Sequence, residues 1–409
     1  MNALVFTFSL GKLAKAKLRG RKDPSGYWRL GGPVGIQQVP HPKLVADDWV
    51  IVKTALSGIC GSDMHELQLE GAMDNPLRSL LSFPQIMGHE AVGFIEKVGT
   101  KATKVKVGDR VAISPWFPCK TRGIIPECPR CQIGDFTHCH NFNRGYLPVG
   151  MHLGVTTGFG TDAPFFAVHE SQCFRIPENV TFEQAVLADP FSVAFHSCLL
   201  LTPLPDQTIL VYGLGIIGIC TILCLKYLFG VKRVLAVGRY DFQVKHALQL
   251  GVERVFTSSG SSLVEEIINY IGSELYIPRK GLKWAMDGVD AVIDTIASAR
   301  TIEVGLRILS TQGKLVIMGV STPARCENTP HYFKELEIFG SAGFSIENFE
   351  GRRAHAIEMF LDFLAKKRVD TTSLVTHKFP LARYQQAFDT IVKKQSTHAI
   401  KVVFDFTQE

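Results

Sequence analysis

The segment TILVYGLGIIG, residues 208–218, decides how the fold of this 409-residue chain is interpreted. A short run of strand-forming residues leads into three closely spaced glycines, and an apolar helical pattern follows them. Three further strand patterns, RVLAVG (233–238), AVIDTI (291–296) and KLVIMG (314–319), alternate with helical patterns downstream. This alternation predicts an α/β fold with an open parallel sheet and helices on both faces.

The three glycines form a G-x-G-x-x-G pattern. Without side chains, the backbone can approach a pyrophosphate at the positive end of a helix. The pattern alone is weak evidence, and a purely structural tight turn is the alternative. The preceding strand and the following helix favour dinucleotide binding. The expected cofactor-binding residues are Gly213, Leu214, Gly215, Ile216, Ile217 and Gly218.

The end of the second strand, VLAVGRYD, bears on the choice of cofactor. NAD-preferring folds place an acid here to accept hydrogen bonds from the ribose hydroxyls. This chain has Gly238 and Arg239 instead. Glycine makes room for a 2′-phosphate and arginine offers it a charged fork, so NADP(H) is favoured over NAD(H). The alternative is that Arg239 is only a surface charge and Asp241 binds the ribose.

Composition indicates an ordinary globular protein of two domains, with 46% hydrophobic and 20% charged residues. A net charge of +6 gives little support for nucleic-acid binding. Of ten cysteines, four crowd into one loop at metal-site spacing and others lie in apolar stretches. That usage predicts a reducing compartment, the cytoplasm. The apolar run 209–225 approaches the length of a membrane span, but its glycines favour the nucleotide-binding interpretation.

The N-terminal stretch is basic over residues 12–22, and its first acid is Asp23. A targeting peptide and a membrane-surface helix are both conceivable. The opening MNALVFTF is typical of a first strand and lacks the layout of a signal peptide. A solvated surface segment is therefore favoured, and membrane association is not expected.

Residues 1–115 alternate like strands separated by turns, whereas 116–145 form a Pro/Gly/Cys-rich loop of the kind that needs a metal. A helix is expected over 181–201, starting at a Thr181 cap. The predicted domains are 1–200, 201–345 and a C-terminal return to the first domain over 346–409.

Two motifs in the first domain carry metal chemistry: GICGSDMH (58–65) and GHE (88–90). Cys60 and His89 are good zinc ligands, and polar groups stand beside them, namely Ser62, Asp63, His65 and Glu90. A buried cysteine and a core histidine are an equally weighted alternative on spacing alone. A separate cysteine motif, Cys128-x2-Cys131-x7-Cys139 with Cys119 upstream, can close a tetrahedral structural zinc site. Disulfides or free thiols are the weaker alternative there.

Together these motifs resemble the zinc-dependent medium-chain dehydrogenase/reductases, the alcohol dehydrogenase superfamily. The similarity extends from ALVFTF through GICGSD, GHE, VKVGDRV, the cysteine loop and VYGLGIIG to KVVFD. It implies a GroES-like, mainly β catalytic domain and a Rossmann cofactor domain, with two zinc ions per chain.

The resemblance also assigns roles to residues. Cys60 and His89 match catalytic zinc ligands, Glu90 the adjacent glutamate, and Asp189 in LADPFSVAFHS a third protein ligand. Residues beside the predicted ligands also match positions of the family. Ser62 and His65 match a proton path, and Asp63 matches the carboxylate that orients the zinc histidine. Eight residues separate Cys119 from Cys128 where the family usually has two, so the place of Cys119 in the structural site is the least certain of the four.

The predicted function is zinc-dependent hydride transfer between a nicotinamide cofactor and an alcohol, a polyol or the corresponding carbonyl compound. The alternatives are a zinc-free enoyl or quinone reductase of the same fold, and a catalytically silent nucleotide-binding scaffold. A small-molecule substrate and a homodimer or homotetramer are implied.

Overall fold

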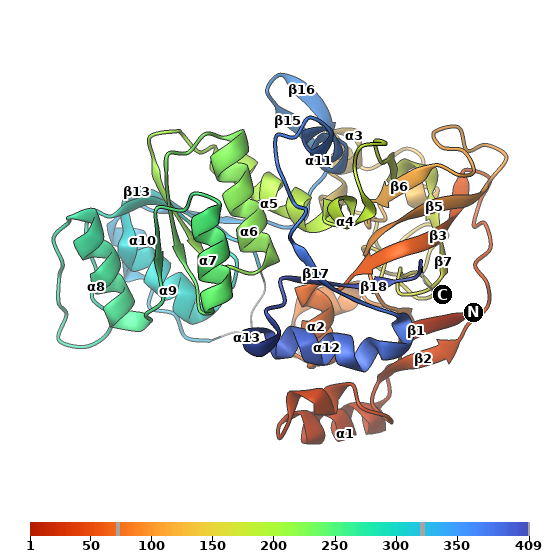
Figure 1. The fold of residues 1–409 in the computed structure, drawn as a ribbon, viewed down its shortest axis with the longest axis horizontal. Helices are drawn as coiled ribbons and strands as arrows, with labels where there is room; N and C mark the ends of the chain where they lie inside the picture. Colours follow the sequence, from red (N-terminus) through yellow and green to blue (C-terminus); the bar gives the residue numbers. More distant parts are fainter. Residues whose placement is uncertain (71–73, 320–323, 408–409) are drawn as a thin grey trace. The chain divides into compact units, whose positions relative to one another are not determined.

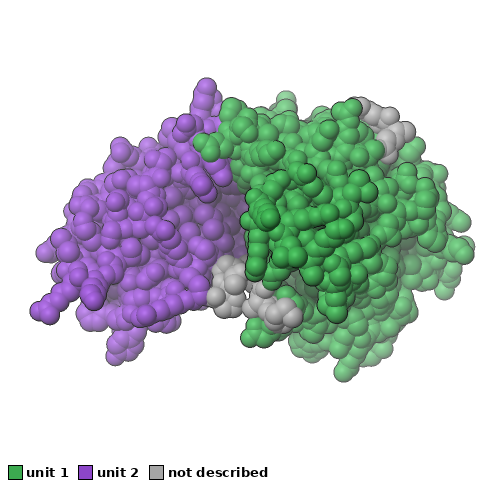
Figure 2. All heavy atoms as spheres, turned by 90° about the horizontal axis from the view of Figure 1, so that it is seen from below, with its two compact units in different colours: residues 1–189, 344–409 green, residues 190–343 purple. Residues whose placement is uncertain are grey.

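The computed structural model describes residues 1–70, 74–319 and 324–407, and the chain divides into two compact units (Figures 1 and 2). Unit 1 comprises residues 1–189 and 344–409, and unit 2 comprises residues 190–343. The sequence places these boundaries at 200/201 and 345/346 instead. The first boundary differs because only the first two residues of helix α5 (Ala188–Leu201) belong to unit 1, and the rest of this helix belongs to unit 2.

Unit 2 is built on a six-stranded sheet in the order β11-β10-β9-β12-β13-β14, and every strand pair in it is parallel. Helices alternate with the strands along the chain, as the sequence pattern predicts, and side chains such as Leu210, Leu263 and Val292 form its fully buried core. Its strands are β9 (Thr208–Tyr212), β10 (Arg233–Val237), β11 (Arg254–Phe256), β12 (Val289–Asp294), β13 (Leu309–Ile317) and β14 (Glu337–Gly340). Its helices are α5 (Ala188–Leu201), α6 (Ile216–Leu223), a π-helical turn (Cys224–Leu228), α7 (Asp241–Gln249), α8 (Gly260–Ile271), α9 (Ala299–Ile308) and α10 (Thr329–Phe333).

Unit 1 is mainly β. Its largest sheet has the order β17-β18-β3-β5-β6-β8, with β7 also pairing with β3. A three-stranded sheet, β2-β1-β4, and the hairpin β15-β16 complete it. The strands are β1 (Asn2–Phe6), β2 (Val34–Gln38), β3 (Trp49–Gly58), β4 (Gln85–Ile86), β5 (Glu90–Val98), β6 (Arg110–Ile113), β7 (Phe165–His169), β8 (Cys173–Arg175), β15 (Ile346–Phe349), β16 (Arg352–His355), β17 (Val375–Phe379) and β18 (Lys401–Asp405).

Short helices connect these strands. The α-helices are α1 (Leu10–Gly20), α2 (Gly61–Leu67), α3 (Pro129–Gln132), α4 (Phe182–Ala185), α11 (Ala356–Ala365), α12 (Tyr384–Val392) and α13 (Lys394–Thr397). The 3-10 turns are η1 (Pro24–Tyr27), η2 (Pro76–Leu80), η3 (Lys120–Arg122), η4 (Phe136–His138), η5 (Glu170–Gln172) and η7 (Leu381–Arg383). The C-terminal strand β18 pairs antiparallel with β3 and lies between β17 and β3, so a C-terminal segment is built into the unit 1 sheet.

The single helix expected over 181–201 is two helices, α4 and α5. Thr181 caps α4 as expected, by accepting a hydrogen bond from the Gln184 N–H. The break follows from Pro190, which has no N–H to donate to Val186 and whose ring would clash with that carbonyl in a continuous helix. A proline is tolerated in the first turn of a helix, and Pro190 lies in the first turn of α5.

The basic N-terminal stretch forms α1 and η1, a helical insertion between β1 and β2 (Figure 1). Among the described residues, no helix has both the length and the apolar character that crossing a membrane requires. The apolar run 209–225 is β9, the glycine loop, α6 and the start of the π-helical turn.

Candidate functional site

Strand pairing brings the first pair of predicted ligands together. Cys60 follows the end of β3 and is the N-cap of α2, while His89 immediately precedes β5. Because β3 and β5 are antiparallel with Gly58 opposite Glu90, the two motifs lie side by side although 28 residues separate Cys60 from His89. Potential ligand atoms of Cys60, His89 and Glu90 all lie within 4.8 Å of one another.

This donor set fits zinc, which accepts thiolate, imidazole and carboxylate ligands. Cys60 is half-buried, and both His89 and Glu90 are buried. Gly58 is required for the arrangement, because a Cβ there would lie 2.3 Å from Glu90 Oε2 and 2.9 Å from Lys401 Cε. Three protein ligands leave an open position, which is the arrangement of catalytic rather than structural zinc.

Asp63 holds the two ligand-bearing segments in place. One of its oxygens accepts a hydrogen bond from the Cys60 N–H at 2.8 Å, and the other lies 3.5 Å from His89 Nδ1. Burial raises the pKa of Asp63, but the attraction of His89 and the hydrogen bonds outweigh it, so this pKa is lowered. For His89, burial opposes the charged form, yet Asp63 and Cys60 raise its pKa well above 6.5. The site therefore favours positive charge, as a cation site should.

Lys401 is a buried member of this site that sequence reasoning missed. Its ammonium donates a hydrogen bond to the Ile59 carbonyl at 3.0 Å and pairs with Glu90 Oε2; both side chains are 1% exposed. Burial acts to lower the pKa of Lys401, but Glu90 and Cys60 raise it overall. Lys401 comes from β18, about 340 residues along the chain from Cys60. The only signal for it in the sequence is the closing segment KVVFD.

Asp189, the other predicted ligand, is buried in the first turn of α5. Burial raises its pKa to about 7, and the negative charges of Glu90 and Asp63 act in the same direction. It interacts electrostatically with His89, but its carboxylate is not in the group of ligand atoms within 4.8 Å. Among the described residues, Glu90 therefore stands nearest to the thiol and the imidazole as the third donor, and Asp189 stays a predicted ligand.

The predicted proton path is exposed. Ser62 and His65 both lie on the exposed side of α2, and His65 Nδ1 pairs with Glu70 Oε2 at 2.5 Å. No hydrogen bond joins Ser62 to His65 among those of the described residues. The relay consequently remains a prediction from resemblance.

Three polar groups around the site had no sequence signal. The His152 ring centroid lies 5.2 Å from those of His89 and Trp116, and burial lowers the His152 pKa to about 3. The Trp116 Nε1 and one Glu66 carboxylate oxygen are buried without a hydrogen-bond partner. Burial, with Asp63 adding to it, raises the Glu66 pKa to about 8. Unpartnered donors and acceptors of this kind suit a polar ligand.

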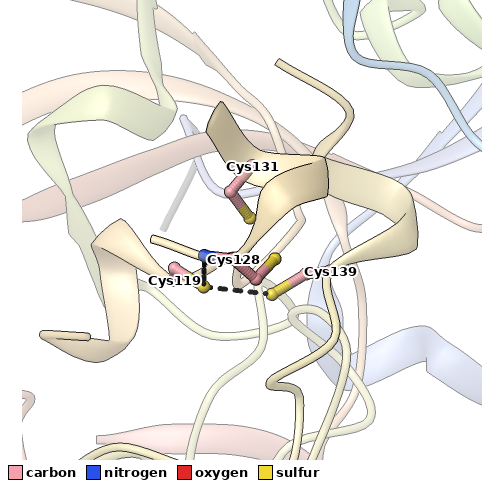
Figure 3. Close-up of side chains that lie close together, drawn as sticks. All are labelled: Cys119, Cys128, Cys131 and Cys139. Atoms are coloured by element: carbon pink, nitrogen blue, oxygen red, sulfur yellow. Dashed lines mark hydrogen bonds between the residues drawn. The ribbon is translucent and has the colours of Figure 1, made fainter. Parts of the chain in front are cut away.

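The four loop cysteines form the second cluster (Figure 3). All are buried and unoxidised, and their sulfur atoms lie within 4.8 Å of one another. Cys119, the least certain by spacing, belongs to this group: its sulfur accepts hydrogen bonds from the Cys128 N–H at 3.3 Å and the Asn141 amide at 3.2 Å. A hydrogen bond from Cys131 lowers the pKa of Cys139 to about 5. Four buried cysteine sulfur atoms gathered in this way fit a closed structural zinc site.

Arg122 supports this loop from inside. Its guanidinium is fully buried, and it donates only to carbonyl oxygens. The acceptors are those of Phe117 (3.2 Å), Arg144 (2.9 Å), Leu147 (3.2 Å), Pro148 (3.0 Å) and Gly150. Burial lowers the pKa of Arg122 to about 10, and the nearby Cys139 and Cys119 oppose that shift. One side chain therefore joins the start of the cysteine loop to its end.

In unit 2 the glycine loop has the geometry that a pyrophosphate requires. Gly213 has φ +101°, and a Cβ on Gly218 would lie 1.9 Å from the Gly213 oxygen. Gly215 is the N-cap of α6, whose first turn contains the predicted Ile216 and Ile217. The structure therefore presents the start of a helix beside a strand end, as the motif predicts.

The residues predicted to select the cofactor lie at the next strand end. β10 is parallel to β9, with Val237 opposite Tyr212, so Gly238 follows directly beside the glycine loop. A Cβ on Gly238 would lie 2.5 Å from the Leu214 side chain. Arg239 is exposed, and α7 begins two residues later at Asp241.

Comparison with known proteins identifies the class. An alcohol dehydrogenase GroES-like domain model matches residues 46–178, and a zinc-binding dehydrogenase model matches residues 217–360. A sorbitol dehydrogenase of Arabidopsis thaliana is 27% identical to this chain, and the match covers 97% of this chain and 100% of the relative. An (R,R)-butanediol dehydrogenase of Saccharomyces cerevisiae is 29% identical, and the match covers 79% of this chain and 84% of the relative. A structure of a short chain alcohol dehydrogenase from E. coli complexed with NADH has a TM-score of 0.75 at 25% identity, with 99% of each chain covered.

Fold and site thus define a zinc-binding dehydrogenase with a GroES-like domain. The chain belongs to the zinc-dependent medium-chain dehydrogenase/reductase family, since the two matches together cover about two thirds of it. This confirms the predicted fold class, a GroES-like domain with a Rossmann domain, and the predicted type of enzyme, an alcohol dehydrogenase acting on CH–OH donors.

Proposed function

We propose that this protein catalyses reversible oxidation of a polyol or secondary alcohol with a nicotinamide cofactor, NADP(H) in preference to NAD(H). The observation that carries the proposal is the convergence of Cys60, His89 and Glu90, held by Asp63 and Lys401, in the GroES-like unit of a chain with a nucleotide loop. A polyol substrate is supported by relatives named for sorbitol and butanediol and by the buried polar groups of Glu66 and Trp116.

Bound zinc supplies Lewis-acid stabilisation of the substrate oxygen, and bound nicotinamide supplies the hydride acceptor. The protein residues do the rest. Asp63 keeps the His89 imidazole oriented, and Lys401 balances the negative charge that Glu90 adds to the thiolate. Ser62 is the proposed acceptor of the alcohol proton, and His65, at the exposed side of α2, its proposed route to solvent.

Zinc is proposed at two places in each chain. Cys60, His89 and Glu90, with Asp189 as a further donor, would hold the catalytic ion, and the four loop cysteines the structural one. We also propose that the protein is cytoplasmic, that it acts as a homodimer or homotetramer, and that it binds no nucleic acid.

The NADP(H) preference follows from Gly238 and Arg239. No carboxylate stands at residue 238 to repel a 2′-phosphate, and the exposed Arg239 can reach it as a bidentate donor. In the Arg239→Ala variant, KM for NADP+ should rise at least about tenfold with KM for NAD+ unchanged. Lys245→Ala, which removes an exposed cation from α7, is the matched control. A wild-type preference for NAD+ would contradict this part of the proposal.

The decisive experiment combines metal analysis with a panel of polyols and secondary alcohols assayed with both cofactors. Two zinc ions per chain and turnover on the panel are expected. In Cys60→Ala, one zinc and all turnover should be lost while cofactor binding persists. Full activity in that variant, or zinc at the cysteine loop alone in the wild type, would instead favour a zinc-free reductase. No turnover with both ions bound would favour a silent scaffold.

A further inference from the structure

Helix α1 presents an apolar row to solvent. Leu10, Ala14 and Leu18 recur every four residues and so lie on one face of the helix. Leu10 is 77% and Leu18 67% exposed, and Ala14 is exposed as well. Leu30, in the segment that follows η1, is 86% exposed. We call the three residues on α1 the leucine row. A contiguous apolar row of this kind on a surface helix indicates a binding surface.

A basic face lies beside the leucine row. Lys12, Lys15 and Arg19, spaced by three and four residues, occupy the neighbouring exposed face of α1, and Lys17 lies on the other side of the row. Among the described residues, none of Lys12, Lys15 and Lys17 forms an ion pair. The helix has no acid of its own. The apolar row is thus flanked by uncompensated positive charge.

The basic surface continues past the helix. Arg19 and Lys22 line a hollow of about 760 Å³ between the insertion and α12. The two acids in its lining are already engaged: Asp23 pairs with Arg29 at 3.0 Å, and Asp389 accepts a hydrogen bond from the Trp28 indole at 2.9 Å. Arg19, Lys22 and Arg29 outnumber the two acids, so the lining of this hollow carries a net charge of +1.

The third face of α1 fixes the helix to the rest of unit 1. Leu13 packs against the core cluster that contains Trp28, and Ala16 and Gly20 are buried. Gly20 permits contact with Tyr27, since a Cβ there would lie 2.2 Å from that ring. The leucine row is thus presented by an anchored helix and not by a loose tail.

The sequence alone favours a solvated surface segment here, but the exposed leucine row leads us to a different inference. We propose that α1 binds the surface of an anionic lipid bilayer, with the leucine row inserted at the level of the headgroups and the lysines directed to lipid phosphates. An apolar row flanked by lysine is the composition of interfacial helices. At 11 residues, α1 is too short to cross a bilayer. A second copy of the chain is a poorer occupant, because packing two leucine rows together would bring two sets of unpaired lysines into contact. This proposal is independent of the proposed enzymatic function.

The test is co-sedimentation of the full-length protein with phosphatidylcholine vesicles that contain or lack phosphatidylserine. Binding is expected only to the anionic vesicles, and it should weaken as salt increases. Leu10→Gln/Leu18→Gln, and separately Lys12→Gln/Lys15→Gln/Lys17→Gln, should each reduce vesicle affinity by about tenfold or more. Circular dichroism and dehydrogenase activity should match the wild type, since α1 contributes no residue to either site.

The matched controls are Leu204→Gln and Lys101→Gln, which alter an exposed leucine and an exposed lysine elsewhere. Neither should change binding. The proposal fails if anionic vesicles do not sediment the protein at low salt, or if the controls lose binding as strongly as the α1 variants. It also fails if light scattering shows a concentration-dependent dimer that Leu10→Gln/Leu18→Gln abolishes, because the leucine row would then be a contact between copies.

Discussion

Replacing Arg122 with methionine tests whether one buried guanidinium holds the cysteine loop together. Methionine fills similar space but donates no hydrogen bond. Of the five carbonyls that Arg122 binds, those of Phe117, Leu147 and Gly150 are in fully buried hydrogen bonds. Each buried acceptor left without a partner costs about 1–3 kcal/mol, so the gross loss is roughly 3–9 kcal/mol.

A second effect offsets part of this loss. Burial lowers the Arg122 pKa from its usual range to about 10, and this shift corresponds to about 3 kcal/mol of unfavourable desolvation that methionine does not incur. Subtracting this offset from the gross loss leaves a net destabilisation of unit 1 of roughly 0–6 kcal/mol, or about 3 kcal/mol at the middle of the range. Because the released carbonyls lie at both ends of the cysteine loop, the structural zinc should also leave more readily.

The assay follows zinc release to a chromogenic chelator during urea unfolding. In Arg122→Met, one of two zinc ions should be released at a lower urea concentration than in the wild type. Arg144→Met, which removes an exposed arginine from the same loop, is the control and should behave like the wild type. If Arg122→Met shows the wild-type midpoint of urea unfolding and the wild-type rate of zinc release, Arg122 does not hold the cysteine loop together.

The remaining predictions concern both units. Gly218→Ala should abolish cofactor binding in fluorescence titration without altering zinc content, because its Cβ would meet the Gly213 oxygen at 1.9 Å; wild-type cofactor affinity would contradict this. If the wild type binds two zinc ions per chain as proposed, Cys131→Ser should release only the structural one, so that metal analysis finds one ion per chain. Burial of Lys334, together with Arg307, lowers its pKa from 10.5 to about 7, so between these values the unfolded state holds a proton that the folded state lacks. Stability should therefore rise with pH over that range, by at most about 5 kcal/mol, and in Lys334→Met this rise should disappear from unfolding midpoints measured from pH 7 to 10.

Sequence reasoning worked best where function depends on neighbours in the chain. The glycine loop, the pair of motifs around Cys60 and His89, and the cysteine cluster are local patterns whose chemistry is limited by residue type and spacing. The membership of Cys119 was doubtful only because its spacing is unusual. The structure places it in the cluster because the chain between Cys119 and Cys128 turns back on itself, so that the Cys128 N–H meets the Cys119 sulfur.

The buried groups that complete the sites have no local signal in the sequence. Lys401 reaches Glu90 only because β18 pairs with β3, and no local pattern indicates which partner a C-terminal strand will take. Arg122 resembles any surface arginine in a polar loop until five carbonyls are seen to surround it. The exposure of Leu10 and Leu18 is similarly hidden, since an amphipathic pattern does not show which of three helix faces is buried.

The class of this protein could be predicted from local sequence patterns alone: a parallel-sheet nucleotide domain, a mainly β metal-binding domain and the residue types that zinc and a dinucleotide require. These follow from periodicity and from short-range backbone geometry, which a linear sequence records directly. The tertiary structure was needed to show that Glu90 lies beside Cys60 and His89, that Lys401 pairs with Glu90, and that one apolar face of α1 is exposed. Those outcomes depend on strand pairing and burial, and both arise from contacts between residues far apart in the chain.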